Sequence, residues 1–499
     1  MTVILIALVT LPLAVTLACF GLPRRVASAA TLTSGALSFA LALVLVAGVR
    51  TATVSAGFLR VDALSVVFLL ATSFLYAVVA GYSVGYLADE ARLASRTGGA
   101  EQQEFRGYSR LFHAGLNAFA WSMLCAPAVN GMALLWIAIE VTTVVSALLV
   151  AIDDTEGATE AAWKYVLLAS SGLGIGLLAT IFMYYAGSQV VGESYDLAFS
   201  PLLAHAGELP ATPVRLAFVL AVVGYGTKVG LFPLHTWLPD AHAEAPTPVS
   251  ALLSGSLLAT SFYAILRYYQ VAVRTLGAPF PQHVLLVFGI LSLALAALYL
   301  LDQRDVKRLL AYSSVEHMGI LAIGVGFGAP IALIGVLLHV LAHAAAKGNA
   351  FMCAGVLVRK YGTKELARIR RGVDTLPWSG PLFLIAVFAL SAMPPFGLFR
   401  SEFEIVAGGL SDGRYTPAAL LLVLVTVAFL GLTVSTTRVL FVADGAPGQA
   451  EAQPRGEPSV WMVVPVLIGV AALFVLGVHP PGDLVTLLQS GATELAGGT

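Results

Sequence analysis

Long apolar runs alternate with short polar loops along almost the whole chain. About fourteen runs are largely apolar over roughly 18 residues or more, which is enough to cross a bilayer as a helix. Strands of a membrane barrel would instead alternate in polarity over about ten residues. The pattern predicts an all-α polytopic membrane protein with spans near 2–20, 27–49, 62–87, 111–129, 131–151, 161–186, 213–239, 247–270, 284–301, 309–328, 331–358, 379–410, 417–442 and 460–478. The stretch from Ala88 to Arg110 is expected to be a loop.

Two of these runs contain proline where a continuous helix would need a backbone donor. The run 213–239 is interrupted at Pro233, and the run 379–410 at Pro394 and Pro395. Irregular backbone at membrane depth is tolerated only beside protein or water. Ion-translocating proteins build their sites at such broken helices. We therefore expect both breaks to lie at functional positions.

Ionisable residues inside the apolar runs form two sets with the same order: a glutamate, a lysine and then a broken helix. A charge at the centre of a membrane helix costs about 2.5 kcal/mol or more, so such residues usually face a cavity and are functional. We interpret the two sets as two copies of a repeat with five spans each. Because five is an odd number, the second copy would be inverted in the membrane relative to the first. The sets are Glu140, Lys164 and Lys228, and then Glu316 with His317, Lys347 and Glu402.

The repeat predicts four regions. They are flanking helices at 1–110, a first half-channel at 111–280, a second, inverted half-channel at 281–443, and a loop, last helix and tail at 444–499.

Composition agrees with a membrane protein and excludes several classes of site. The chain is 58% hydrophobic and only 11% charged, with a mean hydropathy of +0.88, whereas soluble domains carry about 25% charged residues. The three cysteines, Cys19, Cys125 and Cys353, lie far apart in apolar runs, which argues against iron–sulfur, haem c and zinc-ribbon ligation. We expect no cofactor, no metal and no nucleic-acid partner.

Charge in the loops predicts the orientation. Lys and Arg concentrate in alternate loops, most densely at 359–371, and such loops face the cytoplasm. Both termini are then expected on the outer side of the cell (inner) membrane. Residues 1–21 lack the basic start and cleavage site of a signal peptide and are expected to form the first span. The glycine-rich segments 170–180 and 324–328 lie within apolar runs and predict close helix packing rather than phosphate loops.

Several segments resemble a known family. HTWLPDAHAEAPTPVSALLSG, with the broken helix before it, is similar to the antiporter-like membrane subunits of respiratory complex I and of the Mrp sodium/proton antiporters. The segments IEVTTVVSALLVA, EAAWKYVLL, LAYSSVEHMGI and HVLAHAAAKGNAFMCAG resemble most closely hydrogenase-4 component F, a subunit of membrane-bound nickel–iron hydrogenases of the formate-hydrogenlyase type. The resemblance covers roughly residues 60 to 440.

The resemblance implies roles for matching residues. Glu140 corresponds to the glutamate that pairs electrostatically with the lysine of the seventh helix, here Lys228. Lys347, with His339 and His343 at helical spacing, corresponds to a central polar axis, and Glu402 to an exit residue. The structural alternatives are a static Glu140–Lys228 pair, histidines that only bond between helices, and polar residues that only satisfy backbone freed by Pro233. Asp240, His242, Glu316 and His317 are further candidates for proton translocation, with a purely structural role as the alternative for each.

One departure concerns the eighth span. Relatives usually carry a lysine or histidine there to join the two half-channels, whereas this chain has Ser254 and Ala259. Two outcomes are open. In the one that we expect, water ordered by Ser254, Ser256, Thr260 and Ser261 bridges the halves. In the other, the halves are unlinked and the protein pumps poorly or not at all. The first outcome predicts a polar cavity beside Ser254 onto which His339 opens.

The resemblance implies a proton-translocating subunit of a membrane-bound oxidoreductase complex without a redox centre of its own. Implied partners are other membrane subunits, a peripheral hydrogenase or dehydrogenase arm, the lipid bilayer and protons, with sodium as the alternative ion. Three other interpretations stay open: an Mrp-like cation/proton antiporter, a complex I pumping subunit, and a non-pumping scaffold.

Overall fold

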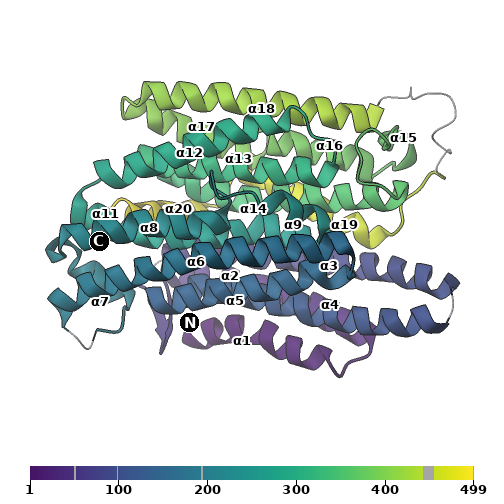
Figure 1. Ribbon diagram of the computed structural model, residues 1–499, viewed down its shortest axis with the longest axis horizontal. Helices are drawn as coiled ribbons and strands as arrows, with labels where there is room; N and C mark the ends of the chain where they lie inside the picture. The colour runs from purple at the N-terminus through teal and green to yellow at the C-terminus, as the bar shows by residue number, and fades with distance from the viewer. Residues whose placement is uncertain (50–51, 98, 193–194, 442–453, 498–499) are drawn as a thin grey trace.

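The protein is a bundle of roughly parallel helices. The computed structural model describes residues 1–49, 52–97, 99–192, 195–441 and 454–497. α1 lies at one edge of the bundle and α18 at the opposite edge, with α19 and α20 between them (Figure 1). Within these residues, eleven helices are long and apolar enough to cross a membrane. The predicted all-α polytopic class is confirmed. The number of fourteen spans stays a prediction, because α4 and the two broken segments are not among the eleven.

The N-terminal region consists of α1 (Thr2–Cys19), α2 (Arg24–Val49) and α3 (Ala63–Thr97), with a short antiparallel hairpin of β1 (Val54–Ala56) and β2 (Leu59–Val61) before α3. The first half contains α4 (Gly99–Cys125), α5 (Met132–Val150), α6 (Glu156–Val191), α7 (Phe199–Ala204), α8 (Ala211–Val229), α9 (Leu238–Glu244), α10 (Thr247–Leu252) and α11 (Leu258–Leu276). A π-helical turn at Leu253–Leu257 joins α10 to α11.

The second half contains α12 (Pro279–Leu300), α13 (Val306–Phe327), α14 (Pro330–Tyr361), α15 (Gly372–Thr375), α16 (Ser379–Leu390), α17 (Gly397–Ser411) and α18 (Tyr415–Phe441). Two further helices, α19 (Val464–Val478) and α20 (Gly482–Leu495), complete the chain. The predicted boundary at 443/444 lies outside the described residues.

One sequence-based expectation is wrong. The stretch from Ala88 to Arg110 is not a loop, because α3 continues to Thr97 and α4 begins at Gly99. Its alanine, glutamate, glutamine and arginine residues are strong helix formers, so the helices extend beyond their apolar parts. The expected C-terminal tail contains α20, whose buried leucines pack towards α3 and α14.

The most buried helices form the centre of the bundle. Helices α3, α11, α13 and α14 are buried along most of their length, whereas α1, α2, α18 and α19 are buried on one side only. The outer helices expose large apolar side chains such as Leu17 and Val423. This distribution is that of a protein whose outer surface contacts lipid and whose polar groups are enclosed by helices.

Both predicted helix breaks are confirmed. α8 ends at Val229 and is capped by Gly230 in the left-handed conformation (φ +84°), which glycine adopts without steric cost. The segment that contains Pro233 follows, and its Phe232 N–H donates to Ser292 Oγ at 2.9 Å. In the second half, Pro394 and Pro395 lie between α16 and α17.

The glycine-rich segments pack helices together, as predicted. A Cβ placed on Gly224 of α8 would lie 2.4 Å from the backbone nitrogen of Gly176 on α6, so only glycine permits this approach. A Cβ on Gly324 of α13 would lie 2.5 Å from Val336 of α14.

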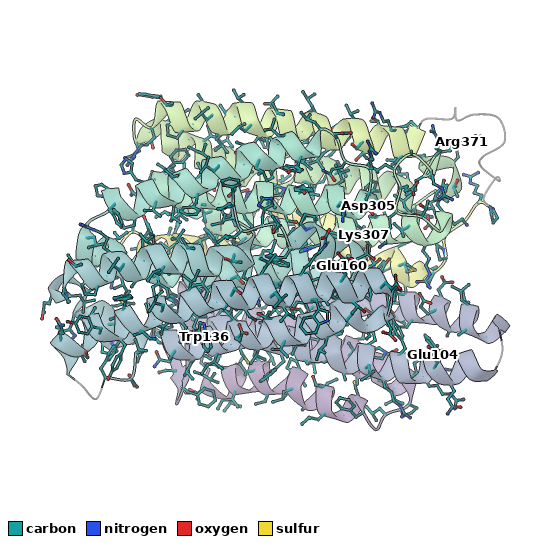
Figure 2. All side chains as sticks on the ribbon, in the orientation of Figure 1. Glu104, Trp136, Glu160, Asp305, Lys307 and Arg371 are labelled. Atoms are coloured by element: carbon teal, nitrogen blue, oxygen red, sulfur yellow. The ribbon has the colours of Figure 1, made fainter. Side chains whose placement is uncertain are left out.

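The two halves repeat one packing arrangement. In each, the broken segment packs on the long helix before it, α8 on α6 and α16–α17 on α14. Both termini lie towards one end of the bundle, and Arg371 lies at the other (Figures 1 and 2). Which end faces the cytoplasm stays a prediction.

Candidate proton-translocation site

Lys228 is fully buried in the last turn of α8. Its Nζ donates to the carbonyl of Ile139 at 2.9 Å and to the hydroxyl of Thr143, both on α5. The ring of Tyr165 lies 5.9 Å from Nζ. A lysine nitrogen without water needs such acceptors, and α5 supplies two of them one helical turn apart.

Glu140 follows Ile139 directly, but its carboxyl group turns towards α6. Ser170 Oγ donates to its Oε1 at 2.9 Å, and its other oxygen is buried without a partner among the described residues. The described part of the chain contains no ion pair between Glu140 and Lys228. Their electrostatic pairing therefore stays a prediction. In this structure the Glu140 carboxyl group bonds to Ser170, and only the neighbouring carbonyl of Ile139 contacts Lys228.

Lys347 has the same kind of environment in the second half. It is fully buried in α14. Its Nζ donates to the carbonyl of Leu310 at 3.0 Å and to the hydroxyl of Ser313, both on α13. Each buried lysine thus contacts one carbonyl and one hydroxyl of a neighbouring helix.

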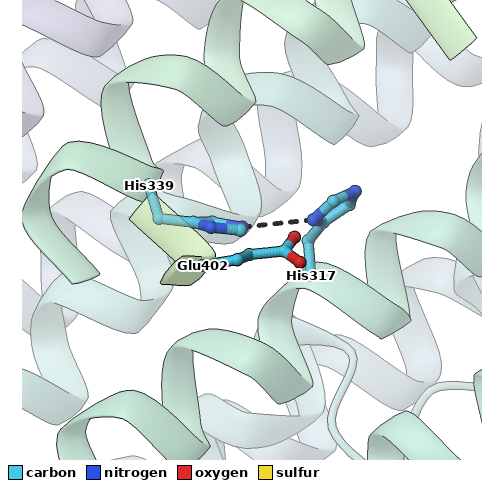
Figure 3. A group of neighbouring side chains, drawn as sticks. All are labelled: His317, His339 and Glu402. Carbon is cyan, nitrogen blue, oxygen red and sulfur yellow. Dashed lines mark hydrogen bonds between the residues drawn. The ribbon is translucent and has the colours of Figure 1, made fainter. Parts of the chain in front are cut away.

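Three buried histidines continue from Lys347. His343 and His339 follow at successive turns of α14, so His339 lies about 12 Å from Lys347 along the helix. His317 of α13 meets them: its Nδ1 lies 3.1 Å from His339 Nε2, and its ring centroid lies 5.1 Å from that of His343 (Figure 3). The three histidines are therefore buried together, and the predicted role of this group as a polar axis with Lys347 stays a prediction.

Carboxyl groups from two helices border this axis. Glu316 of α13 is buried, with one oxygen unpartnered among the described residues. Glu402 of α17 points at the imidazoles (Figure 3). One ligand atom each of His317, His339 and Glu402 lies within 4.8 Å of the others, so these three side chains can hold a cation.

Lys164 is not buried as the sequence suggested. Its side chain is about half exposed and pairs with Glu160 at 2.6 Å and Asp240 at 3.3 Å. Asp240 also binds Arg308 of α13. Lys164 lies only two turns from the start of α6, where side chains reach the surface. These residues form a surface ion cluster, and their role in translocation stays a prediction.

His242 of α9 lies between the two halves. Its Nδ1 is 2.8 Å from the carbonyl of Leu238, which can only accept, so Nδ1 carries the proton. Its Nε2 is buried without a partner among the described residues. Aromatic rings border it on either side, Trp237 towards the first half and Phe351 of α14 towards the second. Trp237 in turn stacks on Tyr165 at 4.4 Å.

Ser254 does not lie beside His339. Its hydroxyl is 2.6 Å from that of Ser314, next to the Ser313 that contacts Lys347. Both ring nitrogens of His339 are engaged elsewhere, with His317 and Ser401. The predicted opening of His339 towards Ser254 is wrong, because the π-helical turn brings Ser254 to the level of Lys347. The two serines meet directly.

Sequence inspection missed two features. Lys307 lies between the predicted spans 284–301 and 309–328, yet it is only 4% exposed, and its Nζ donates to the carbonyl of Ala245 at 2.7 Å. The signal was Asp305, which caps α13 and places Lys307 in its first turn. The hydroxyl partners Thr143 and Ser313 carried no signal, since serine and threonine are common in membrane helices.

The arrangement can bind, hold and release protons at buried amines and imidazoles. Lys228, Lys347, His317 and His339 each have a hydroxyl, carbonyl or ring nitrogen within hydrogen-bond distance. Both ring nitrogens of His343 are buried without a partner among the described residues.

Known proteins are similar to this chain in sequence and in fold. The family model "NADH:quinone oxidoreductase/Mrp antiporter, TM" matches residues 130–431. The hydrogenase-4 component F homolog of Methylacidiphilum infernorum is 34% identical over 435 residues, covering 87% of each chain.

Two solved structures have the same fold over nearly the whole chain. A chain of respiratory complex I from Thermus thermophilus is 25% identical with a TM-score of 0.81, covering 98% of this chain and 99% of its own. A chain of the Mrp complex from a Dietzia species is 18% identical with a TM-score of 0.84, covering 99% and 98%. The chain therefore belongs to the NADH:quinone oxidoreductase/Mrp antiporter transmembrane family, as an antiporter-like membrane subunit of the complex I, Mrp and hydrogenase-4 type.

Proposed function

We propose that this chain conducts protons across the membrane as one subunit of a group 4 nickel–iron hydrogenase complex of the formate-hydrogenlyase type. Electron transfer takes place in other subunits, and this chain supplies the proton path. The similarity to a hydrogenase-4 component F homolog supports this choice of complex.

The observation that carries the proposal is the matched environment of the two buried lysines. Lys228 and Lys347 lie in different halves, yet each contacts a carbonyl and a hydroxyl of the neighbouring helix. A neutral amine has two N–H groups, and two acceptors satisfy both of them. An ammonium has a third, which needs water or a carboxylate. The two acceptors therefore suit a neutral amine, and a negative charge that approaches favours uptake of a proton.

Glu140 is the group that can bring this charge in the first half. Its carboxyl group is held by Ser170 and has a free oxygen. A shift of the carboxyl group towards Lys228 favours the ammonium, and its return favours release of the proton. Glu316 has the corresponding place near Lys347.

His242 joins the halves in this proposal. Its Nε2 is a base without a partner among the described residues. Trp237 beside it stacks on Tyr165, whose ring lies 5.9 Å from Lys228 Nζ, and Phe351 beside it lies one turn after Lys347 on α14. From Lys347 the proton passes along His343, His317 and His339 to Glu402. A histidine on α9 thereby replaces the base that the eighth span lacks.

Two experiments test the proposal. Isolation of the chain from its native membrane, with identification of the subunits that accompany it, should recover nickel–iron hydrogenase subunits; Mrp-type or complex I subunits alone would contradict the choice of complex. In vesicles containing the complex, Lys347→Met should abolish redox-driven proton uptake while hydrogenase subunits stay attached. Normal uptake in that variant would favour the scaffold interpretation.

A further inference from the structure

We propose that His317, His339 and Glu402 form a binding site for a divalent transition ion such as Zn²⁺. The three side chains come from α13, α14 and α17 and are buried together at one point of the bundle (Figure 3). The sequence does not suggest this site, because its ligands lie on three separate spans. Binding of the ion requires no proton transport, so the inference goes beyond the proposed function.

The ligand set suits zinc. Two imidazoles and one carboxylate are the protein ligands of open zinc sites, which keep a fourth position for water. With bonds of about 2.0–2.1 Å, tetrahedral ligand atoms lie roughly 3.4 Å apart. The facing nitrogens of His317 and His339 are 3.1 Å apart, and all three ligand atoms lie within 4.8 Å of one another. Because the two nitrogens face each other in a hydrogen bond, both imidazoles and the Glu402 side chain turn towards the ion to complete the geometry.

Ser401 prepares His339 for this role. The Ser401 hydroxyl donates to the carbonyl of Leu398 at 2.9 Å, so its oxygen is left to accept from His339 Nδ1 at 3.0 Å. The proton of His339 therefore lies on Nδ1, and the lone pair of Nε2 points into the cluster. Partners of this kind fix the tautomer and orientation of metal-bound histidines.

His317 can become a ligand by exchanging its ring proton. Without metal, its Nδ1–H donates to His339 Nε2, and its Nε2 is unpartnered among the described residues. When the ion binds, the proton moves to Nε2 and Nδ1 coordinates. Any proton on Glu402 leaves to solvent, so the ion is bound by two neutral imidazoles and one carboxylate.

A cavity borders the carboxyl end of the site. Glu402 lines a cavity of about 350 Å³ beside the second helix break, together with Ser391, Met393, Phe403 and residues of α18. The cavity also leaves room for the water at the fourth position. If the proposed proton path is correct, a bound ion occupies two imidazoles of that path and blocks it.

The test is a Zn²⁺ titration of the purified full-length chain in lipid nanodiscs, made metal-free and without a polyhistidine tag, against a chromophoric chelator. We expect one tight site per chain. Ser401→Ala should weaken the affinity about 10–100-fold, and Glu402→Gln and His339→Gln should remove the site. His343→Gln, which changes a buried histidine one turn away, should keep it.

Equal Zn²⁺ affinity in the native chain, Ser401→Ala and Glu402→Gln would overturn the proposal, as would loss of the site in His343→Gln. Co²⁺ gives a second readout: the native chain should show a tetrahedral absorption spectrum that changes in Ser401→Ala. Because binding is measured without turnover, a chain that binds Zn²⁺ but conducts no protons would refute the proposed function and leave the metal site intact.

Discussion

The proposed path depends on buried amines with few partners. Lys228 and Lys347 each have two acceptors and no ion pair among the described residues, an arrangement that suits a neutral amine. The same carbonyl and hydroxyl cannot satisfy all three N–H groups of an ammonium. A small change nearby can therefore decide whether each lysine holds a proton.

At Glu140, the charge rather than the shape should matter. We expect Glu140→Gln to abolish most redox-driven proton uptake, because glutamine keeps the bond from Ser170 but has no charge. Glu140→Asp should retain part of the activity. Proton uptake into vesicles measures both variants, and equal activity of the two would rule out the electrostatic role.

At His242, loss of the free ring nitrogen should separate the halves. We expect His242→Gln to slow proton uptake about a hundredfold, the size typical for removal of one positioned proton carrier. The matched control is His283→Gln, an exposed histidine at the start of α12 whose Nδ1 lies 2.5 Å from the carbonyl of Pro279. Equal rates in the two variants would mean that protons cross between the halves elsewhere.

A substitution at Ser254 distinguishes between two routes for protons between the halves, one through His242 and one through water held by Ser254. The Ser254 hydroxyl donates to Ser314, which itself donates to Leu310. We expect Ser254→Ala to cost about 1 kcal/mol of stability and to lower proton uptake far less than His242→Gln does. A larger effect on uptake from Ser254→Ala would restore the hydrated bridge and remove His242 from the path.

Among the elements, α20 is attached to α3 through a titratable contact. The Glu494 carboxyl group accepts from the N–H groups of Ala63 and Leu64 at 3.2 and 3.1 Å and so caps α3. Burial, followed by the charge of Asp62, raises the pKa of Glu494 to about 7. Burial also opposes ionisation of Asp62, but Arg267 and Arg60 hold the pKa of Asp62 below its ordinary value.

The raised pKa of Glu494 predicts weaker docking of α20 at higher pH. The unfolded carboxyl group ionises near pH 4.3, while the folded one keeps its proton up to about pH 7. Protonated Glu494 therefore stabilises the docking of α20 fully below about pH 4.3, and this stabilisation is lost as the pH rises through about 7. Hydrogen exchange of α20 between pH 5 and 8 measures this. In Glu494→Gln, the protection of α20 should no longer depend on pH in this way. If the variant shows the same pH dependence as the native chain, Glu494 is not its cause.

Several elements could be predicted from the sequence because their signals are local. The apolar runs gave the helices, Pro233, Pro394 and Pro395 gave the breaks, and lone charges in apolar runs gave Lys228 and Lys347. Contacts between distant segments could not be predicted. Neither the meeting of His317 with His339 nor the direct bond of Ser254 to Ser314 has a signal in the sequence. Lys164 was misplaced because a charge near a span end looks like a buried one.

At the scale of the molecule, two halves of related packing each enclose one of the matched lysines Lys228 and Lys347, and His242 lies between them. If protons pass through both halves in series, the loss of either lysine stops transport completely. If each half conducts independently, loss of one lysine leaves about half of the flux.

The most direct test of this account is redox-driven proton uptake by vesicles containing the complex with Lys228→Met. Methionine keeps the length of the side chain and removes the amine. We predict that uptake falls to the background level while the complex stays assembled, and that the control Lys360→Met, a lysine that donates to the carbonyl of Gly456 away from the path, pumps normally. Near-normal uptake by Lys228→Met would contradict the account.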